Sequence, residues 1–449
     1  MMTPHSILTN TRRGMRLAVG ASLLLVVASC QSLLDVKNPN NIAESALDNP
    51  AAAGPEANGA LATLTRALAY STLVYAEATD EIDWIGSRDS WNELDKGAIG
   101  NFANEFADDE FKFIAEARYV SDQAIFRLEG FDKAGTLAAR TDLMRAYIYG
   151  AVAYASIADM YDDFAFSNKT VAAAPVGRAN MGKLYDTAVG YLDKAFAIAT
   201  SNADKYNILA YRARVKHGKA VWAKVTPKGA SAPASPLVSD AGAIADATAA
   251  IALGSTDAAF DLFNNVEATA TNIWFEVNGR NESAPGKTYV VDPISTANKY
   301  VAALADPISN TPDVRLQTRL TQFKNFGTLS GTLWITNSRE LRLILAEAAL
   351  AGGNTAEFTS QINAVRALDG KPAFAGQISN TAMLVYERQV ELWLMRRRLM
   401  DMARFGVKDV KWTSNASYEN LFSQVGLLFP IANVERQANP CVADATKCQ

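Results

Sequence analysis

Two stretches rich in tryptophan and short polar side chains are the parts of this 449-residue chain whose residue types could do chemistry. The first, residues 79–106, combines aromatic rings with carboxylate, amide and guanidinium groups. An aromatic ring can stack on the C–H face of a sugar, while the polar groups hydrogen-bond its hydroxyls. This pattern predicts a binding site for a polyhydroxylated ligand; the alternative is that both tryptophans pack the loop onto a helical core. The candidate residues are Asp83, Trp84, Arg88, Trp91 and Asn92.

The second stretch, residues 255–333, holds the other ligand-binding candidates. These are Trp274, Asn278 and Arg280, and Trp334 follows the stretch. Long loops held by a rigid scaffold are common places for binding residues. We predict that this stretch contributes to the ligand face; the alternative is that Trp274 is the centre of a small local core.

Histidine is too scarce to support the common nucleophilic or zinc-dependent mechanisms. The chain has two histidines: His5 lies in the predicted leader, and His217 lies in a helical run, where a lone histidine is most often a packing residue. A Ser-His-Asp or Cys-His arrangement would need His217 as its base. The remaining enzymatic alternative is a glycoside hydrolase using Asp80 and Glu93, which requires carboxylates roughly 5 to 9.5 Å apart. We expect binding without a reaction.

The chain offers little for metals, cofactors or nucleic acid. Carboxylates cluster at Asp108-Asp109-Glu110 and at Asp162-Asp163, where calcium would find oxygen ligands, although solvated surface carboxylates are the simpler interpretation. We therefore expect no metal and no cofactor. The net charge of −4 and the lack of a basic stripe interleaved with aromatic residues argue against nucleic acid.

The elements that must position these residues are helices. Hydrophobic residues make up 49% and charged residues 20% of the chain, which suffices for a large core. Alanine- and leucine-rich runs dominate over alternating β-branched ones. We predict an all-α, tetratricopeptide-like scaffold of helical hairpins, with residues 79–106 and 255–333 as long irregular loops. Helices are expected at 59–78, 110–128 paired with 141–161, 184–200 paired with 206–225, 239–253, and 339–350 paired with 355–368.

A charged run near the C-terminus, Glu387 to Gly406, is predicted to form one amphipathic helix. Its apolar residues recur at steps of three and four, and its ionisable residues stand at spacings at which helix side chains meet. Gly406 occupies the position of a C-cap glycine. Because the apolar side is wide, part of the ionic set is expected to pack against the core and to fix geometry rather than to catalyse. The alternative is a solvated helix.

Residues 1–29 are predicted to be a lipoprotein signal peptide. Three arginines precede an apolar run at 17–27 that is short for a membrane-spanning helix, and Val27-Ala28-Ser29-Cys30 resembles a bacterial lipobox. Acyl chains on Cys30 would anchor residues 30–449, predicted as a single domain, since each buried methylene adds roughly 0.8 kcal/mol. The alternative is an ordinary signal peptide with an incidental cysteine.

The two remaining cysteines, Cys441 and Cys448, lie close together at the C-terminus. In an exported protein this pair can close a small disulfide loop. The alternative is two free thiols on a frayed tail.

The C-terminal part of the chain resembles the SusD/RagB family of outer-membrane nutrient-uptake lipoproteins. In that family a helix reads approximately E-R-x-x-E-L-x-x-E-G-x-R-x-x-D-L-x-R-x-G, and the charged run follows this pattern without an insertion. The departure is Met395-Arg396, where the family usually has Glu-Gly. The matching residues are Glu387, Arg388, Glu391, Leu392, Arg398, Asp401, Arg404 and Gly406.

The resemblance implies a mainly α-helical, lipid-anchored protein exposed on the cell outer membrane. Such a protein binds a nutrient, an oligosaccharide or a peptide, and delivers it unchanged to a SusC-like TonB-dependent β-barrel transporter. The alternative is a tetratricopeptide-like periplasmic adaptor for a protein or peptide partner, which needs no exposed tryptophan.

Overall fold

The computed structural model describes residues 44–168, 171–225, 228–229, 231–264, 272–294, 299–325, 330–414 and 417–448. The chain divides into two compact units, Met1–Asn49 and Pro50–Gln449. The described part of the first unit contains the 3-10 helix η1 (Glu44–Ala46). The predicted leader and the lipid attachment at Cys30 lie outside the described residues. All further structure belongs to the second unit.

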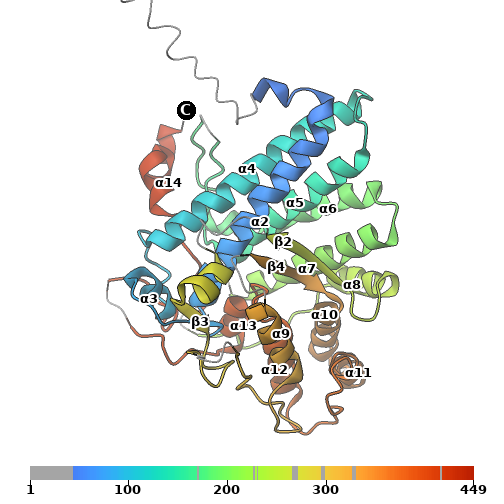
Figure 1. Cartoon of the computed structure of the whole chain (residues 1–449), viewed down its shortest axis with the longest axis vertical. Helices are drawn as coiled ribbons and strands as arrows, with labels where there is room; N and C mark the ends of the chain where they lie inside the picture. The colour runs from blue at the N-terminus through green and yellow to red at the C-terminus, as the bar shows by residue number, and fades with distance from the viewer. Residues whose placement is uncertain are drawn as a thin grey trace, which may run out of the picture. The chain divides into compact units, whose positions relative to one another are not determined.

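Helices that pack on their neighbours along the chain form the scaffold of the second unit (Figure 1). Helix α2 packs on α4, α4 on α5, α5 on α6, α6 on α7 and α7 on α8, while α10 packs on α11. The predicted helical class and the three predicted hairpins are therefore confirmed, with bounds that differ by a few residues. The scaffold helices are α2 (Ala53–Glu77), α4 (Glu105–Lys133), α5 (Arg140–Met160), α6 (Lys183–Ile198), α7 (Asn202–Val225), α8 (Ala241–Leu253), α10 (Ser338–Ala351) and α11 (Thr355–Ala367).

Side-chain caps mark where several of these helices begin. The side chains of Asn104, Asp240, Asn337 and Asn354 accept hydrogen bonds from backbone N–H groups in the first turns of α4, α8, α10 and α11. These donors would otherwise have no partner within the helix. Each cap is worth about 1 kcal/mol.

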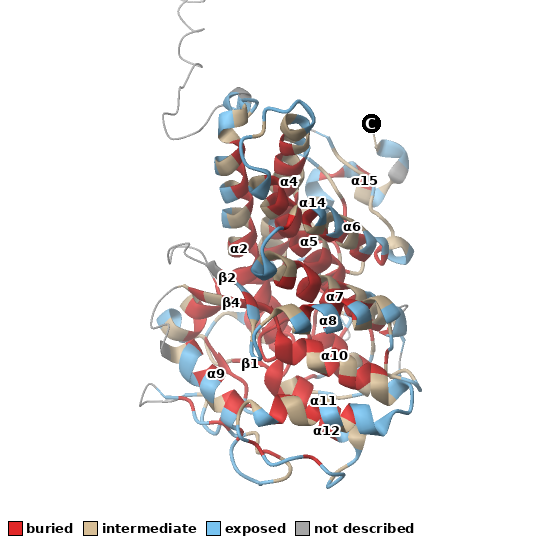
Figure 2. Ribbon diagram, turned by 90° about the vertical axis from the view of Figure 1, so that its right-hand side faces the viewer, coloured by how far each residue is buried: buried red, intermediate tan, exposed pale blue. Residues whose placement is uncertain are grey.

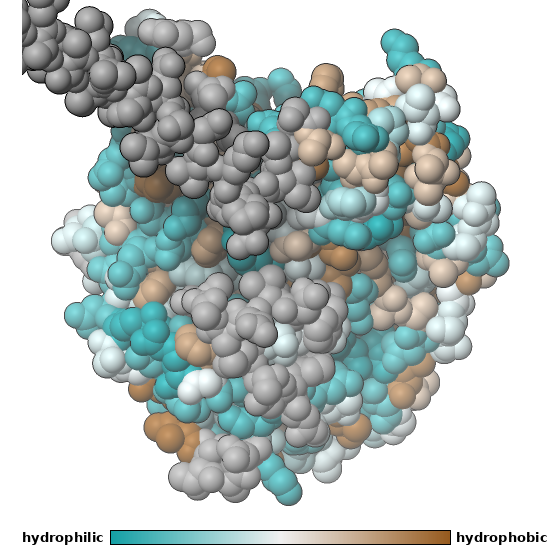
Figure 3. Space-filling model, turned by 45° about the horizontal axis from the view of Figure 1, so that its top comes forward, coloured by the Kyte–Doolittle hydropathy of each residue, from teal (hydrophilic) through white to brown (hydrophobic). Residues whose placement is uncertain are grey.

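The helices enclose a core that contains the C-terminal half of α2 and much of α5. Every residue of α2 from Leu68 to Glu77 is buried, and so is every residue of α5 from Ala146 to Ala153 (Figure 2). The surface seen in Figure 3 is mostly hydrophilic, with separate small apolar groups. Within the described part of the chain, no helix is both long enough and apolar enough to cross a bilayer.

The two stretches predicted as irregular loops contain short regular elements. In the first stretch these are β1 (Ile82–Trp84) and α3 (Asp89–Asp95). The expectation of irregular structure is wrong for helix α9 (Val314–Asn325), in which Leu316, Leu320 and Phe323 are buried at helical spacing. It is also wrong for β2 (Ala259–Asn264), which pairs antiparallel with β4 (Gly331–Asn337). The elements of the second stretch are β2 (Ala259–Asn264), the π-helix η4 (Phe275–Arg280), β3 (Ser283–Pro285), α9 (Val314–Asn325) and the beginning of β4 (Gly331–Asn337).

The single helix predicted from Glu387 to Gly406 is two helices, α12 (Asn380–Glu391) and α13 (Arg398–Phe405). In the connection, Leu394 and Arg396 adopt positive φ angles of 58° and 56°. Residues with a Cβ rarely adopt this conformation, and Arg396 stands where the family pattern has glycine. Gly406 ends α13 with a φ of 69°, as predicted.

The C-terminal segment contains short helices and a disulfide. These helices are α14 (Asn433–Ala438), α15 (Pro440–Ala443) and η5 (Ala445–Lys447). Cys441 and Cys448 are bridged, with their Cα atoms 5.1 Å apart, inside the range that a disulfide allows.

Candidate functional site

A two-stranded ribbon brings the two irregular stretches together. Strand β1 of the first pairs antiparallel with β3 of the second, with Asp83 opposite Ala284. Directly after β3, a Cβ on Gly286 would lie 2.1 Å from the carbonyl oxygen of Asp80. A glycine is required here because no side chain fits between the two backbones. The two stretches are therefore in direct contact, and we call the surface that they form the loop face.

Arg88 joins the same two stretches through its side chain. Its guanidinium forms ion pairs with Glu276 of η4 and, at 2.6 Å, with Glu282. It also lies 4.7 Å from the ring centroid of Phe106, whose ring stacks on Trp91 with centroids 3.7 Å apart. The side chain of Arg88, a predicted ligand contact, is thus occupied by contacts within the protein, and only 23% of it is exposed.

The two tryptophans Trp91 and Trp274 lie in the core. Trp91 has 0% and Trp274 has 2% of its surface exposed. Trp91 faces Phe106, and Trp274 packs so closely on Gly331 of β4 that a Cβ there would lie 2.5 Å from the indole. In this structure both residues match the alternative of packing residues, and stacking on a sugar would require them to leave the core.

Two polar candidates are also used inside the protein. Asp83 pairs with Lys411 and accepts a hydrogen bond of 3.0 Å from the backbone N–H of Lys287. Asn278 donates to the carbonyl of Phe323 at 3.2 Å. Both contacts join segments of the loop face to one another or to the scaffold.

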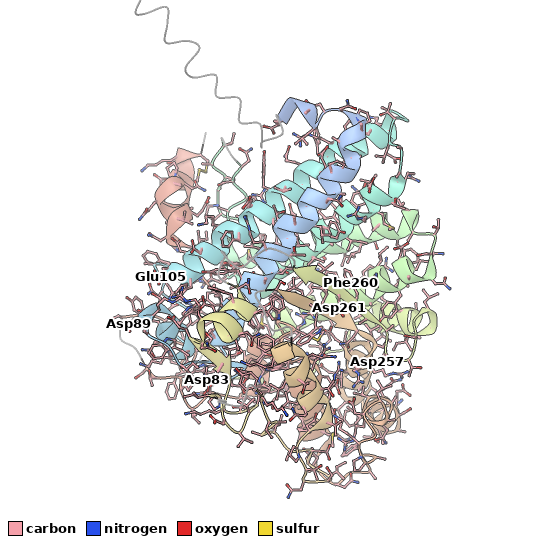
Figure 4. The ribbon with its side chains drawn as sticks, viewed as in Figure 1. Asp83, Asp89, Glu105, Asp257, Phe260 and Asp261 are labelled. Atoms are coloured by element: carbon pink, nitrogen blue, oxygen red, sulfur yellow. A yellow bond between two sulfur atoms is a disulfide. The ribbon has the colours of Figure 1, made fainter. Side chains whose placement is uncertain are left out.

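The candidates that remain accessible are Trp84, Asn92 and Arg280. Trp84 and Asn92 are partly exposed, and Arg280 is exposed while its guanidinium lies 3.4 Å from Glu282. In the view of Figure 4, Asp83 and Asp89 of the first stretch lie well apart from Asp257, which precedes β2, and Asp261, which belongs to β2. The loop face therefore presents polar groups at more than one place.

The charged C-terminal run anchors the first stretch. Arg398 of α13 holds Asp80 through two hydrogen bonds, Nε to Oδ1 at 2.7 Å and Nη2 to Oδ2 at 2.6 Å. The N–H of Leu394 donates to the buried carboxyl of Glu81 at 2.7 Å, and the positive φ of Leu394 belongs to the turn that presents this N–H. The expected packing of the ionic residues against the core is confirmed, because they are buried and pair with one another, with the loops or with the scaffold helices.

The same region anchors the second stretch. Arg366 bridges Asp306 at 2.7 Å and Glu387 at 2.6 Å. Lys371 bridges Asp313 at 3.2 Å and Glu387 at 3.0 Å. Burial alone would lower the pKa of Lys371, but the surrounding carboxylates hold it above its ordinary value.

His217 is a packing residue, as predicted. Its side chain is buried and its Nε2 lies 3.0 Å from Oε2 of Glu347, which also pairs with Arg404. Burial lowers the pKa of His217, against the opposing effect of Glu347.

The carboxylates considered for catalysis or calcium are engaged elsewhere. Asp80 pairs with Arg398, and Glu93 accepts hydrogen bonds from Asn101 at 2.9 Å and Asn104 at 3.1 Å. Over the described ranges, no group of three or more His, Cys, Asp or Glu side chains could hold a metal ion. In the first acidic cluster, Asp108 accepts a hydrogen bond from one backbone N–H group, Asp109 pairs with Lys112, and Glu110 accepts from Ser71. In the second cluster, Asp162 pairs with Arg178, and Asp163 accepts hydrogen bonds from two backbone N–H groups.

A cavity of about 450 Å³ borders the first stretch, and we call it the Phe102 cavity. Phe102 is 45% exposed, and the guanidinium of Arg436 lies 4.8 Å from its ring centroid. The ring of Phe102 is therefore accessible, although Phe102 is not among the ligand-binding candidates chosen from the sequence. The glycine and asparagines around it, Gly100, Asn101 and Asn104, are typical of a loop and could have indicated its exposure. The lining includes Gly100, Phe102, Asp162, Arg178, Lys228, Glu419 and Arg436.

A second cavity of about 370 Å³ lies between α9 and the β2–β4 ribbon, and we call it the Arg319 cavity. It combines cationic, anionic, amide and hydroxyl groups with an indole. Sequence reasoning misses it because α9, which supplies both arginines, is not expected. The lining includes Asp257, Asp261, Arg315, Arg319, Gln322, Thr332 and Trp334.

Solved structures with the same fold are SusD proteins. A SusD homolog from Bacteroides thetaiotaomicron aligns with a TM-score of 0.58 and 16% identity over 89% of this chain and 98% of its own. A SusD superfamily protein from Bacteroides vulgatus gives 0.56 and 15% over 88% and 98%. A SusD-like carbohydrate binding protein from Bacteroides vulgatus gives 0.54 and 12% over 88% and 97%. No protein-family model and no curated protein matches the sequence. The comparisons show that the chain has the SusD fold.

Proposed function

We propose that this chain is a SusD-type nutrient-binding lipoprotein that takes an oligosaccharide on its loop face and passes it to a SusC-like TonB-dependent transporter. The fold is the observation that carries the proposal, because it extends over nearly the full length of the similar proteins, one of which is a SusD-like carbohydrate binding protein. The C-terminal ionic residues support it, since they match the family pattern and anchor both loop stretches.

Binding is expected to leave the ligand chemically unchanged. The acid and base candidates Asp80, Glu93 and His217 each contact a protein side chain that holds them in place. A glycosidase needs one carboxyl group to protonate the leaving oxygen and a second to attack or to activate water. Recognition by hydrogen bonds and ring contacts is the chemistry that the accessible groups support.

Contacts to the ligand are expected from the accessible side chains of the loop face. These are Trp84, Asn92 and Arg280 of the predicted set, together with Phe102. The indole and phenyl rings would stack on sugar faces, and the amide and guanidinium groups would hydrogen-bond hydroxyls. Acylation of Cys30 would hold the protein at the outer membrane, on the cell surface.

The test of delivery is made in the source cells with a tagged chain. We expect it to co-purify with a TonB-dependent barrel, to be cleaved by protease added to intact cells, and to leave the membrane fraction when Cys30→Ala is introduced. Protection from external protease, with a soluble protein as the co-purifying partner, would instead identify a periplasmic adaptor. Uptake that is unchanged by deletion of the barrel would contradict the delivery step.

A further inference from the structure

The Arg319 cavity contains a buried arginine that forms no ion pair with any carboxylate of the described residues. Arg315 and Arg319 stand one turn apart on α9, and both line the cavity. Arg315 lies 3.2 Å from Glu391. Arg319 is only 6% exposed, yet among the described residues no carboxylate forms an ion pair with it, and its Nε has no hydrogen-bond acceptor.

Three other buried arginines are arranged differently, whereas the buried Arg396 donates to the hydroxyl of Thr72. Arg366, Arg398 and Arg404 each face a carboxylate at hydrogen-bonding distance. A buried charge is costly unless it is paired. Burial, together with the neighbouring Arg315, lowers the pKa of Arg319 to about 9 against the attraction of Asp261 and Glu391. The guanidinium therefore still carries its charge at neutral pH, and no carboxylate in the described part of the chain pairs with it directly.

The nearby acidic groups do not fill this role. Asp257 is held by Arg339 through hydrogen bonds of 2.8 and 2.9 Å. Asp261 is a residue of β2 (Figure 4); its carboxylate attracts Arg319 and accepts a hydrogen bond from the backbone N–H of Ile335, but it forms no ion pair with Arg319. Both carboxylates line the cavity, so a singly charged anion is tolerated there better than a phosphate or sulfate dianion.

The guanidinium of Arg319 lies over an indole ring. The guanidinium carbon of Arg319 lies 3.9 Å from the ring centroid of Trp334, and the indole is itself packed against Trp393. A guanidinium stacked in this way directs its N–H donors outward in a fork that matches the two oxygens of a carboxylate.

We infer that the Arg319 cavity binds the carboxylate of an acidic sugar, a uronate unit of the oligosaccharide ligand, with Arg319 as its principal contact. This inference rests on the proposed function, and it names the ligand class. The volume of about 370 Å³ falls within the range of small-molecule pockets, roughly 300 to 1,000 Å³. Gln322 and Thr332 on the lining offer amide and hydroxyl groups to the sugar hydroxyls.

The test titrates the purified mature chain, by calorimetry at low salt, with tetragalacturonate, an oligoglucuronate, the methyl ester of tetragalacturonate and neutral maltotetraose. At least one acidic sugar is expected to bind at least tenfold more tightly than the neutral sugars. The variants Arg319→Gln and Arg319→Lys should each weaken acid binding by tenfold or more, because lysine keeps the charge but loses the fork. The control Arg342→Gln, on α10, should bind as the parent does.

A stability readout separates a ligand contact from a structural residue. Arg319→Met removes a buried unpaired charge, so its unfolding midpoint in urea is expected to equal or exceed that of the parent while acid binding is lost. Equal affinity for acid and ester, or acid binding that survives in Arg319→Gln, would overturn the inference while binding of maltotetraose still supports the proposed function. Failure of every sugar to bind would contradict both, and preferential binding of an acidic peptide would overturn the sugar assignment.

Discussion

The pair formed by Asp80 and Arg398 offers a sharp test of how the ligand face is held. Asp80 begins the first stretch and Arg398 lies on α13, and their two hydrogen bonds measure 2.7 and 2.6 Å. Their side chains are only 7% and 6% exposed. The perturbations are Asp80→Leu, Arg398→Met and the two together.

The expected magnitudes follow from this burial. Removing one partner leaves a buried charge without its counter-ion, which costs about 3 to 5 kcal/mol. Removing both leaves no unpaired charge, so the double variant should be less destabilised than the sum of the single variants by at least about 2 kcal/mol. An exposed pair such as Lys112 and Asp109, at 53% and 50% exposure, should contribute less than about 1 kcal/mol.

The assay is urea unfolding of the mature chain, followed by far-UV circular dichroism and by tryptophan fluorescence, with Lys112→Ala as the surface control. Limited proteolysis should also show earlier cleavage in residues 79–106 for each single variant. Single substitutions that cost less than about 1 kcal/mol, or a double variant whose cost is the sum of the two, would refute the view that this pair anchors the loop.

Three further predictions use the same unfolding assay. Gly286→Ala should destabilise the protein by about 1 to 3 kcal/mol, because the added Cβ would lie 2.1 Å from the carbonyl oxygen of Asp80. The helical control Gly190→Ala, whose Cβ would have no atom within 4 Å, should stabilise the protein slightly. Equal effects of the two substitutions would contradict the close approach at Gly286. Arg396→Gly should be about 1 kcal/mol more stable than Arg396→Ala because φ is 56° there, and the reverse order would show that the turn differs. Burial raises the pKa of Glu110 from 4.5 to about 8, so its contribution to stability is complete below pH 4.5 and is lost as the pH rises through 8. Glu110→Gln should therefore lose less stability than the parent between pH 5 and 7, by about 2 to 3 kcal/mol, and parallel profiles would disprove this.

The scaffold could be predicted from the sequence because helical periodicity is local. The eight scaffold helices follow from the spacing of their apolar residues. The break before α13 could not, because the residues of that turn include neither glycine nor proline. It depends on a contact between the N–H of Leu394 and Glu81, more than three hundred positions away in the chain.

The candidate site was less predictable, because exposure depends on tertiary contacts. Trp84 and Trp91 both have polar neighbours in the sequence, so the sequence does not distinguish them. In the structure the ring of Phe106 stacks on Trp91, which is buried, while Trp84 is partly exposed. Gly331 similarly accepts Trp274 into the core. The Arg319 cavity needs α9 and the β2–β4 ribbon together, and neither is apparent from the turn-rich residues around them.

The most direct measurement of the central claim is an array of glycans and peptides probed with the purified mature chain, with Trp84→Ala probed in parallel. We predict saturable binding to a glycan, weaker binding by the variant, and recovery of the glycan uncleaved after incubation. Binding to peptides alone, or release of shortened sugars from the glycan, would contradict the account.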